Sequence, residues 1–180
     1  MNDQNRSRGP VVGTSNKVLV SACLLGREVR YDGKDSPVKS ASGLQWLAAM
    51  HRAQRLVAVC PEVGGGLSVP RPPAELVGGD GLAFWRGQAR VISVEGLDVS
   101  AEFERGACLA LELARRHQVC AAVLKARSPS CGGASVYDGS FEGRLIPGQG
   151  VTAALLRWAG VAVFTDEELD QARAFVEARG

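Results

Sequence analysis

The 180-residue chain lacks the long apolar segments by which proteins cross a membrane. No apolar run reaches the roughly 20 residues that a helix needs to span a bilayer. The first 16 residues are polar and contain no apolar stretch typical of a secretory signal, so we expect residues 1–16 to form a disordered tail. These absences favour a cytoplasmic protein, in which cysteines serve metal binding, catalysis or packing before disulfides.

The sequence also lacks a strong excess of charge. Lysine and arginine number 21 against 19 aspartate and glutamate residues, which leaves a formal net charge of +2. This balance gives no sign of a large nucleic-acid surface, and we expect no stable nucleic-acid complex. Histidine is scarce as well: His51 and His117 fall in or at the ends of predicted helices, and we assign them no chemistry.

Neither an internal repeat nor a linker divides the chain after the tail. Hydrophobic residues make up 46% and charged residues 22%, which is ordinary for a globular protein. A chain of this length can bury a sizeable core in one unit. We therefore predict a single domain over residues 17–180.

Short apolar runs alternate with helical patterns along this domain. Continuous apolar runs predict buried strands at residues 17–23, 56–60, 119–124 and 161–164. Helical patterns occupy residues 43–54, 101–117, 150–158 and 169–178. This alternation predicts an α/β fold, Rossmann-like, with a mostly parallel sheet and helices on both faces.

Two further segments are expected to add small β elements to this sheet. Residues 83–94 predict one or two short strands, arranged as a hairpin through Gly87. Residues 135–147 contain two glycines and predict an inserted hairpin or flap. Residues 62–73 show no regular pattern, and long loops of this kind inside a compact domain are usually functional.

Three of the five cysteines follow predicted strands. Cys23 ends the first strand, Cys60 ends the second, and Cys131 follows the third after a short loop. Because ligands of open α/β sheets bind beyond the carboxyl ends of the strands, we expect these thiols to meet at one edge. Three thiolates suit a soft metal centre, and a missing fourth ligand is typical of a catalytic zinc or iron–sulfur site.

A plainer interpretation of the same cysteines stays open. Cysteine is among the most buried residue types, and the three positions form no C-x-x-C pair. Cys108 lies inside a predicted helix and Cys120 inside a predicted strand, so we interpret both as small buried hydrophobic residues.

Four segments together resemble, in the same order, the hallmark segments of the thiouracil desulfidase family. They are V-S-A-C-L-L-G at 20–26, V-C-P-E-V-G-G-G-L at 59–67, P-R-P-P-A-E at 70–75 and K-A-R-S-P-S-C-G-G at 125–133. The resemblance extends from about residue 17 to the C-terminus, with G-Q-G at 148–150 and F-T-D-E-E at 164–168 also in keeping.

The resemblance implies a [4Fe-4S] cluster held by Cys23, Cys60 and Cys131, with an open iron that takes the sulfur of a thiolated uracil. Cleavage of the carbon–sulfur bond with water would give uracil and hydrogen sulfide without net redox change. Members of the family act on free thiouracil and on thiouridine nucleotides such as 4-thiouridine monophosphate. A longer relative with an additional domain acts on transfer RNA, and this chain carries no such domain, which favours a small substrate.

Such a reaction needs groups that move protons and hold the substrate. Glu62 lies two residues after Cys60 and is the candidate general acid–base, the alternative being a loop carboxylate paired with an arginine. Ser128 and Ser130 lie beside Cys131, and either hydroxyl could position substrate or water. The resemblance implies a catalytic serine here, for which we favour Ser128, and we take Ser130 as a candidate substrate contact. Lys125 and Arg71 are candidate donors to a uracil carbonyl or a phosphate.

Two other classes of function remain compatible with these residues. One is a non-catalytic iron–sulfur or zinc module, in which the carboxylate would be structural. The other is a metal-free sulfur carrier that uses Cys131 as a persulfide. Substitution of single cysteines identifies the persulfide carrier, because only Cys131→Ala should abolish its activity. Loss of activity with metal retained in Glu62→Ala separates catalysis from a structural module.

Overall fold

The computed structural model describes residues 15–179, so most of the predicted tail lies outside the described residues. The last two residues of that predicted tail already contact the domain. The Ser15 hydroxyl donates to the carbonyl of Gln118 at 2.7 Å, and Arg55 Nε donates to the carbonyl of Asn16 at 2.9 Å. Ser15 and Asn16 are therefore part of the folded domain.

A parallel sheet of four strands forms the centre of the molecule. It consists of β1 (Val18–Ser21), β2 (Leu56–Val59), β5 (Ala121–Leu124) and β8 (Ala162–Thr165), in the order β2-β1-β5-β8. Every neighbouring pair is parallel. The strands lie within two residues of the predicted ones, and the predicted α/β fold with a parallel sheet is confirmed.

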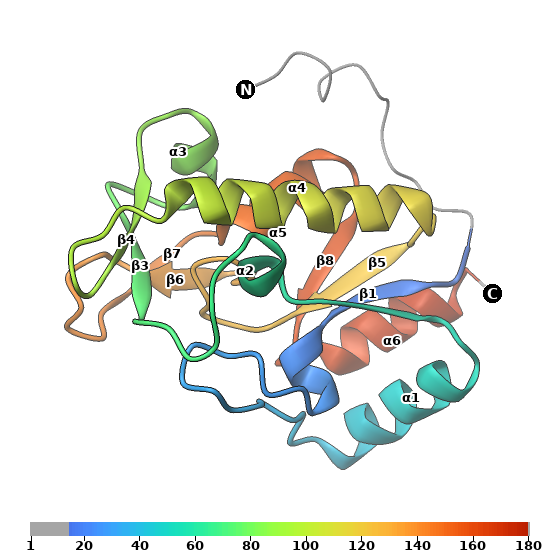
Figure 1. Ribbon diagram of the computed structural model, residues 1–180. Helices are drawn as coiled ribbons and strands as arrows, with labels where there is room; N and C mark the ends of the chain where they lie inside the picture. Colours follow the sequence, from blue (N-terminus) through green and yellow to red (C-terminus); the bar gives the residue numbers. More distant parts are fainter. Residues whose placement is uncertain (1–14, 180) are drawn as a thin grey trace.

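Helices cover both faces of this sheet (Figure 1). On one face lie α1 (Ala41–Arg52) and α6 (Leu169–Glu177), and on the other α4 (Ser100–Arg116) and α5 (Val151–Trp158). All four had been predicted within two residues at each end. None of the helices in residues 15–179 is long and apolar enough to span a bilayer.

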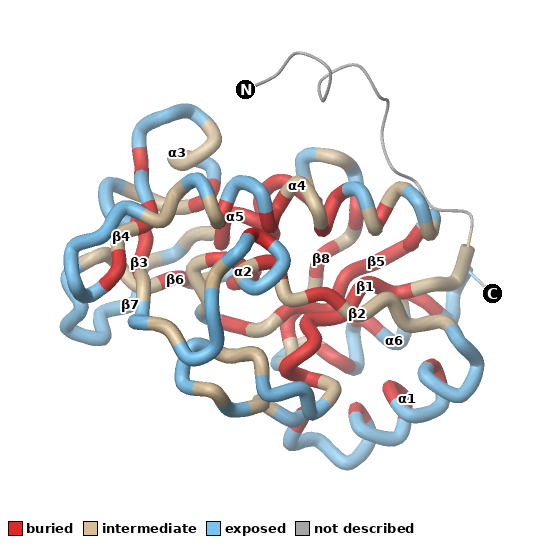
Figure 2. The backbone as a smooth tube through the Cα atoms, in the orientation of Figure 1, coloured by how far each residue is buried: buried red, intermediate tan, exposed pale blue. Residues whose placement is uncertain are grey.

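The two central strands, β1 and β5, are buried on both faces, which explains their continuous apolar sequences (Figure 2). Along β1, Val18 and Val20 pack with residues of α1 and α6, whereas Leu19 packs with residues of α4 and α5. All three side chains are 0% exposed. Successive side chains of a strand point to opposite faces, so a strand between two helical layers needs apolar residues at every position.

Two small antiparallel pairs flank one end of the sheet. One pair is β3 (Ala74–Val77) with β4 (Arg90–Ser93), and the other is β6 (Ser135–Tyr137) with β7 (Leu145–Pro147). The predicted hairpin at 135–147 is therefore confirmed. Glu75 of β3 joins the two pairs, because its Oε2 accepts from the backbone N–H of Gly139 in the β6–β7 turn at 3.0 Å.

The prediction of a hairpin through Gly87 is wrong. The first part of that segment belongs to a short helix, α3 (Gly81–Trp85), and β4 pairs with β3, a strand that the sequence pattern had not indicated. Asp80 starts the helix, since its Oδ1 accepts from the backbone N–H groups of Leu82 and Ala83. An aspartate at this position is a common helix start and was the available signal.

A short helix, α2 (Pro61–Gly64), lies directly on the backbone of α4. A Cβ at Gly106 would lie 1.9 Å from the carbonyl oxygen of Pro61, and one at Gly65 would lie 2.0 Å from that of Glu102. The two segments come this close only because neither residue has a side chain. This packing sets the position of α2 and of the residues around it.

Candidate active site at the carboxyl edge of the sheet

A cavity of about 750 Å³ lies at the carboxyl edge of the parallel sheet. Residues that follow each of the four strands line it, together with the loops after the 3₁₀-helix η2 (Ala22–Leu25) and after α2. The strand order reverses between β1 and β5, and this switch point is where open α/β sheets bind ligands.

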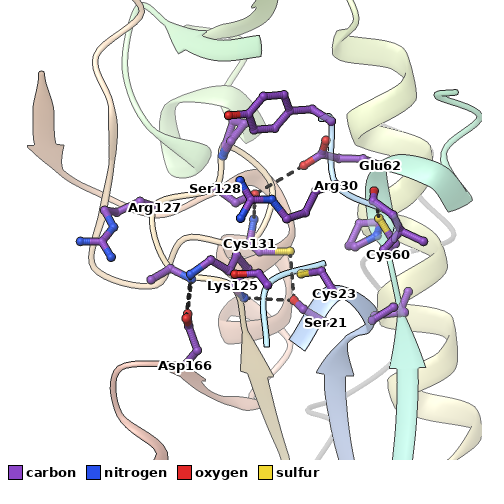
Figure 3. A pocket seen from close by; sticks show the side chains of 18 of the residues that line it. Ser21, Cys23, Arg30, Cys60, Glu62, Lys125, Arg127, Ser128, Cys131 and Asp166 are labelled. Atoms are coloured by element: carbon purple, nitrogen blue, oxygen red, sulfur yellow. Dashed lines mark hydrogen bonds and ion pairs between the residues drawn. The ribbon is translucent and has the colours of Figure 1, made fainter. Parts of the chain in front are cut away.

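Three thiols line this cavity (Figure 3). Cys23 lies in η2 directly after β1, Cys60 lies between β2 and α2, and Cys131 lies in the loop after β5. Cys23 and Cys131 are buried, and Cys60 is half-buried. Cysteines that are far apart in the sequence thus lie around one space, as the rule for parallel sheets predicts.

Burial makes these thiols weak acids. It raises the pKa of Cys23 to about 11 and that of Cys131 to about 12, and it also raises the pKa of Cys60. Repulsion between neighbouring thiolates adds to this effect. Cys60 raises the pKa of Cys23, and Cys23 and Cys60 both raise the pKa of Cys131. A metal cation bound by these thiols would favour their thiolate forms, so that its binding would release protons.

Ser21 contacts the most buried of the three thiols. Its hydroxyl donates to the sulfur of Cys131 at 3.5 Å and accepts from the backbone N–H of Lys125 at 3.0 Å. The side chain is 2% exposed. Sequence reasoning missed this residue, although it ends the first strand two residues before Cys23.

Glu62 lies in the first turn of α2 and forms an ion pair with Arg71. Its Oε2 accepts from Nε of Arg71 at 2.9 Å and from Nη2 at 2.7 Å. Its other oxygen, Oε1, lies 3.4 Å from the hydroxyl of Ser128 (Figure 3). Glu62 thus has the arginine partner that the plainer interpretation required and also one oxygen directed to the cavity serine.

The two serines around Pro129 differ in position. Ser128 lines the cavity, and its Oγ accepts from the backbone N–H groups of Ser130 and Cys131, each at 3.1 Å. Ser130 is 1% exposed, and its hydroxyl bonds Thr152 at 2.9 Å. Ser130 is not among the residues that line the cavity. This placement argues against the predicted contact of Ser130 with a substrate.

The predicted cationic residues line the cavity but are already paired. Lys125 Nζ donates to Oδ2 of Asp166 at 2.7 Å, and Oδ1 of Asp166 accepts from the backbone N–H of Ala126 at 2.7 Å. Arg71 is occupied by Glu62 and by backbone carbonyls. Asp166 was missed as a site residue, although it follows the fourth strand at the same sheet edge. Arg30 also lines the cavity, from a polar loop that offered no signal.

The two remaining cysteines lie outside the cavity. Cys120 lies at the amino end of β5, where its thiol donates to the carbonyl of Lys17 at 3.4 Å, and Cys108 packs from α4 against the core. None of the five, all within the described chain, forms a disulfide. In residues 15–179, no three His, Cys, Asp or Glu side chains are grouped closely enough to hold a single metal ion.

These features define the class of protein. A parallel α/β sheet carries at its carboxyl edge a small-molecule cavity lined by three buried thiols, with a carboxylate–serine pair beside them. Thiolates are typical ligands of soft metals, and a carboxylate within hydrogen-bonding distance of a hydroxyl can take up and release a proton. Such a combination of groups is typical of enzymes that bind a metal centre through thiolates.

Comparison with known proteins supplies the family. Residues 18–168 match the family described as 2-thiouracil desulfurase. The chain belongs to this family of enzymes, as its motifs had indicated.

Two relatives support the assignment. The uncharacterized protein YbbK of Bacillus subtilis (strain 168) is 40% identical over 153 residues, which cover 85% of this chain and 97% of YbbK. A solved structure described as the [4Fe-4S]-dependent thiouracil desulfidase TudS matches with a TM-score of 0.80 and 44% identity. That match covers 91% of this chain and 99% of TudS.

Proposed function

We propose that the protein is a [4Fe-4S]-dependent desulfidase of thiolated uracil compounds. The substrate class is a thiolated base or its nucleotide, such as 4-thiouracil or 4-thiouridine monophosphate. Water replaces the sulfur, so that C=S and H₂O give C=O and H₂S without net redox change. The observation that carries the proposal is the meeting of three strand-end thiols and the Glu62–Ser128 pair around one cavity.

The residues around the cavity fit a cluster with three protein ligands. Cys23, Cys60 and Cys131 would hold it, and their sulfurs surround the space without closing on one point. A cluster distributes its ligands over several irons, whereas a single zinc ion needs all of them within one coordination sphere. When bound, the cluster supplies a Lewis-acidic iron that polarises the C=S bond and accepts sulfide.

Glu62 and Ser128 are the proposed acid–base groups. Backbone N–H groups occupy both acceptor positions of the Ser128 oxygen, so its hydroxyl hydrogen is left to donate toward the cavity or to Glu62 Oε1. Oε1 has no cationic partner and is the atom that would take a proton from the attacking water and return it to the leaving sulfur. Lys125 donates one of its three ammonium N–H groups to Asp166, and we propose that another donates to a uracil carbonyl.

The size of the cavity supports a small substrate. Pockets for small molecules usually measure about 300–1,000 Å³, and this cavity of about 750 Å³ falls inside that range. A pyrimidine nucleotide together with a cluster is of the right order to fill it. The proposal therefore requires no partner macromolecule.

The test begins with anaerobic reconstitution of the purified protein with iron and sulfide. The readouts are the visible spectrum, the iron content and the sulfide released from 4-thiouracil and 4-thiouridine monophosphate. Cys23→Ala, Cys60→Ala and Cys131→Ala should each lose iron and activity. Cys120→Ala is the matched control, since it removes a buried thiol at the opposite sheet edge and should retain both.

Glu62→Gln separates catalysis from metal binding. This variant should keep the iron–sulfur spectrum and lose roughly 10²–10⁴-fold in turnover. Stoichiometric zinc without a cluster would favour the non-catalytic module. Activity that survives in the Cys23 and Cys60 variants and disappears only with Cys131 would favour the persulfide carrier. Either result would overturn the proposed function.

A further inference from the structure

Backbone carbonyl groups hold the guanidinium of Arg71, in addition to its contacts with a carboxylate. Nη1 donates to the carbonyl oxygen of Ser68 at 3.0 Å, and Nη2 donates to that of Val29 at 3.1 Å. The backbone N–H of Arg71 also donates to the carbonyl of Tyr31 at 2.9 Å. Main-chain groups from two loops therefore set the orientation of the guanidinium independently of Glu62.

The guanidinium donates to only one of the two carboxylate oxygens of Glu62. Both remaining contacts, from Nε and Nη2, go to Oε2. The terminal torsion of a glutamate is broad, so an unpaired carboxylate would sample many orientations. Two converging donors on Oε2 select the orientation in which Oε1 faces Ser128 and the cavity.

The ion pair is shielded from solvent, and Arg71 has little capacity left for a substrate. The side chain of Arg71 is 6% exposed and that of Glu62 is 16% exposed, so water screens the pair weakly. Of the five N–H donors of a guanidinium, Ser68, Val29 and Glu62 take four. The remaining N–H cannot form the two-pronged contact by which arginine binds phosphate or carboxylate.

We propose that Arg71 is a positioning residue, which fixes the carboxylate of Glu62 so that Oε1 is presented to the reacting atoms. The inference rests on the proposed function and replaces the expectation that Arg71 binds substrate. Arg71 acts on the chemistry only through Glu62. Loss of Arg71 should therefore lower kcat and leave KM unchanged, because no contact with substrate is removed.

The test is a double-mutant cycle on the reconstituted full-length protein. The variants are Arg71→Met, Arg71→Lys, Glu62→Gln and the double variant Arg71→Met/Glu62→Gln. Arg55→Met is the control, since Arg55 is a half-buried arginine that bonds a backbone carbonyl at the opposite sheet edge. Each variant is assayed for kcat, KM, iron content and urea unfolding of the metal-free chain.

Displacement of a catalytic group by about 1 Å can cost roughly 10²-fold, and we expect a loss in kcat of that order for Arg71→Met. Arg71→Lys keeps the charge but lacks the fork, and its kcat should fall between those of Arg71→Met and wild type. In the Glu62→Gln background, loss of Arg71 should cost no further kcat, because the group it positions is already gone. Iron content should match wild type throughout.

Two results would overturn the inference. A raised KM with kcat retained in Arg71→Met would make Arg71 a substrate-binding residue. Losses that multiply in the double variant would show that Arg71 acts apart from Glu62. The unfolding data do not depend on activity: they should show coupling between the two residues even if the wild-type protein released no sulfide. Absence of sulfide release from the wild-type protein would refute the proposed function, whereas coupling in the unfolding data would still show the ion pair between Arg71 and Glu62.

Discussion

Replacement of Gly106 by alanine tests whether the close packing of α2 on α4 positions the site. A Cβ at this residue would lie 1.9 Å from the carbonyl oxygen of Pro61 and 2.6 Å from its carbonyl carbon. Both contacts are with backbone, so no rotation of a side chain relieves them. To reach an ordinary contact distance, α2 must move by more than ~1 Å, which exceeds the tolerance of a catalytic group.

Two opposing effects decide whether Gly106→Ala raises or lowers the free energy of unfolding. Glycine in a helix interior costs about 1 kcal/mol relative to alanine, so Gly106→Ala would stabilise an otherwise unconstrained α4. Overpacking against backbone typically costs about 1–3 kcal/mol, and here the clash extends over several atoms. We therefore expect a net loss of about 1–2 kcal/mol in the free energy of unfolding.

The larger effect should fall on the site, because α2 carries Glu62 and follows Cys60 directly. Urea unfolding of the metal-free protein, iron content after reconstitution and turnover are the readouts. Gly43→Ala is the matched control in α1: its Cβ would meet side-chain atoms and no backbone, Cδ1 of Leu169 at 2.5 Å and Cγ1 of Val38 at 3.1 Å. It should lie close to wild type. Gly106→Ala with raised stability and full turnover would refute this account of the packing.

Two further predictions concern the buried polar groups of the site. Ser21→Ala removes the acceptor of the Lys125 backbone N–H and the donor to Cys131, and it should lower the free energy of unfolding by about 1–3 kcal/mol in urea titrations; an unchanged midpoint would contradict it. Burial raises the pKa of Cys23 from 9.0 to about 11, so in the unfolded chain this thiol loses its proton first as the pH rises. Because the unfolded state then binds fewer protons, Cys23 alone should lower the free energy of unfolding of the metal-free protein by about 1.4 kcal/mol per pH unit between pH 9 and 11, in addition to what the other buried thiols contribute. Cys23→Ala should show a smaller fall, and identical pH profiles of the two proteins would rule the effect out.

The gathering of the three thiols could be predicted because it depends on backbone topology alone. Continuous apolar runs identified the strands, and parallel strands bring their carboxyl ends to one edge whatever the side chains are. Cys23, Cys60 and Cys131 inherit their common location from this rule. The small elements at 74–93 were harder to predict from the sequence. The helix α3 begins at Asp80-Gly81, inside a segment whose apolar residues also fit a strand.

The partners of individual side chains could not be predicted in the same way. Ser21 and Cys131 are 110 residues apart, and their contact depends on the rotation of two side chains within a formed site. The pairing of Lys125 with Asp166 likewise joins the ends of neighbouring strands β5 and β8. Hydrophobic periodicity carries no information on such contacts, because it specifies which face of an element is buried and not which polar groups meet there.

The polar contacts also limit which groups are left for chemistry. Asp166 neutralises the ammonium of Lys125, carbonyls and Glu62 occupy Arg71, and backbone N–H groups fill both acceptor positions of Ser128. What stays available for proton transfer is the hydroxyl hydrogen of Ser128 and Oε1 of Glu62, 3.4 Å from the Ser128 oxygen. Under the proposed function, proton transfer would therefore depend on this one pair of atoms, and this is why we expect a distant change such as Gly106→Ala to act on turnover through the position of a single carboxylate.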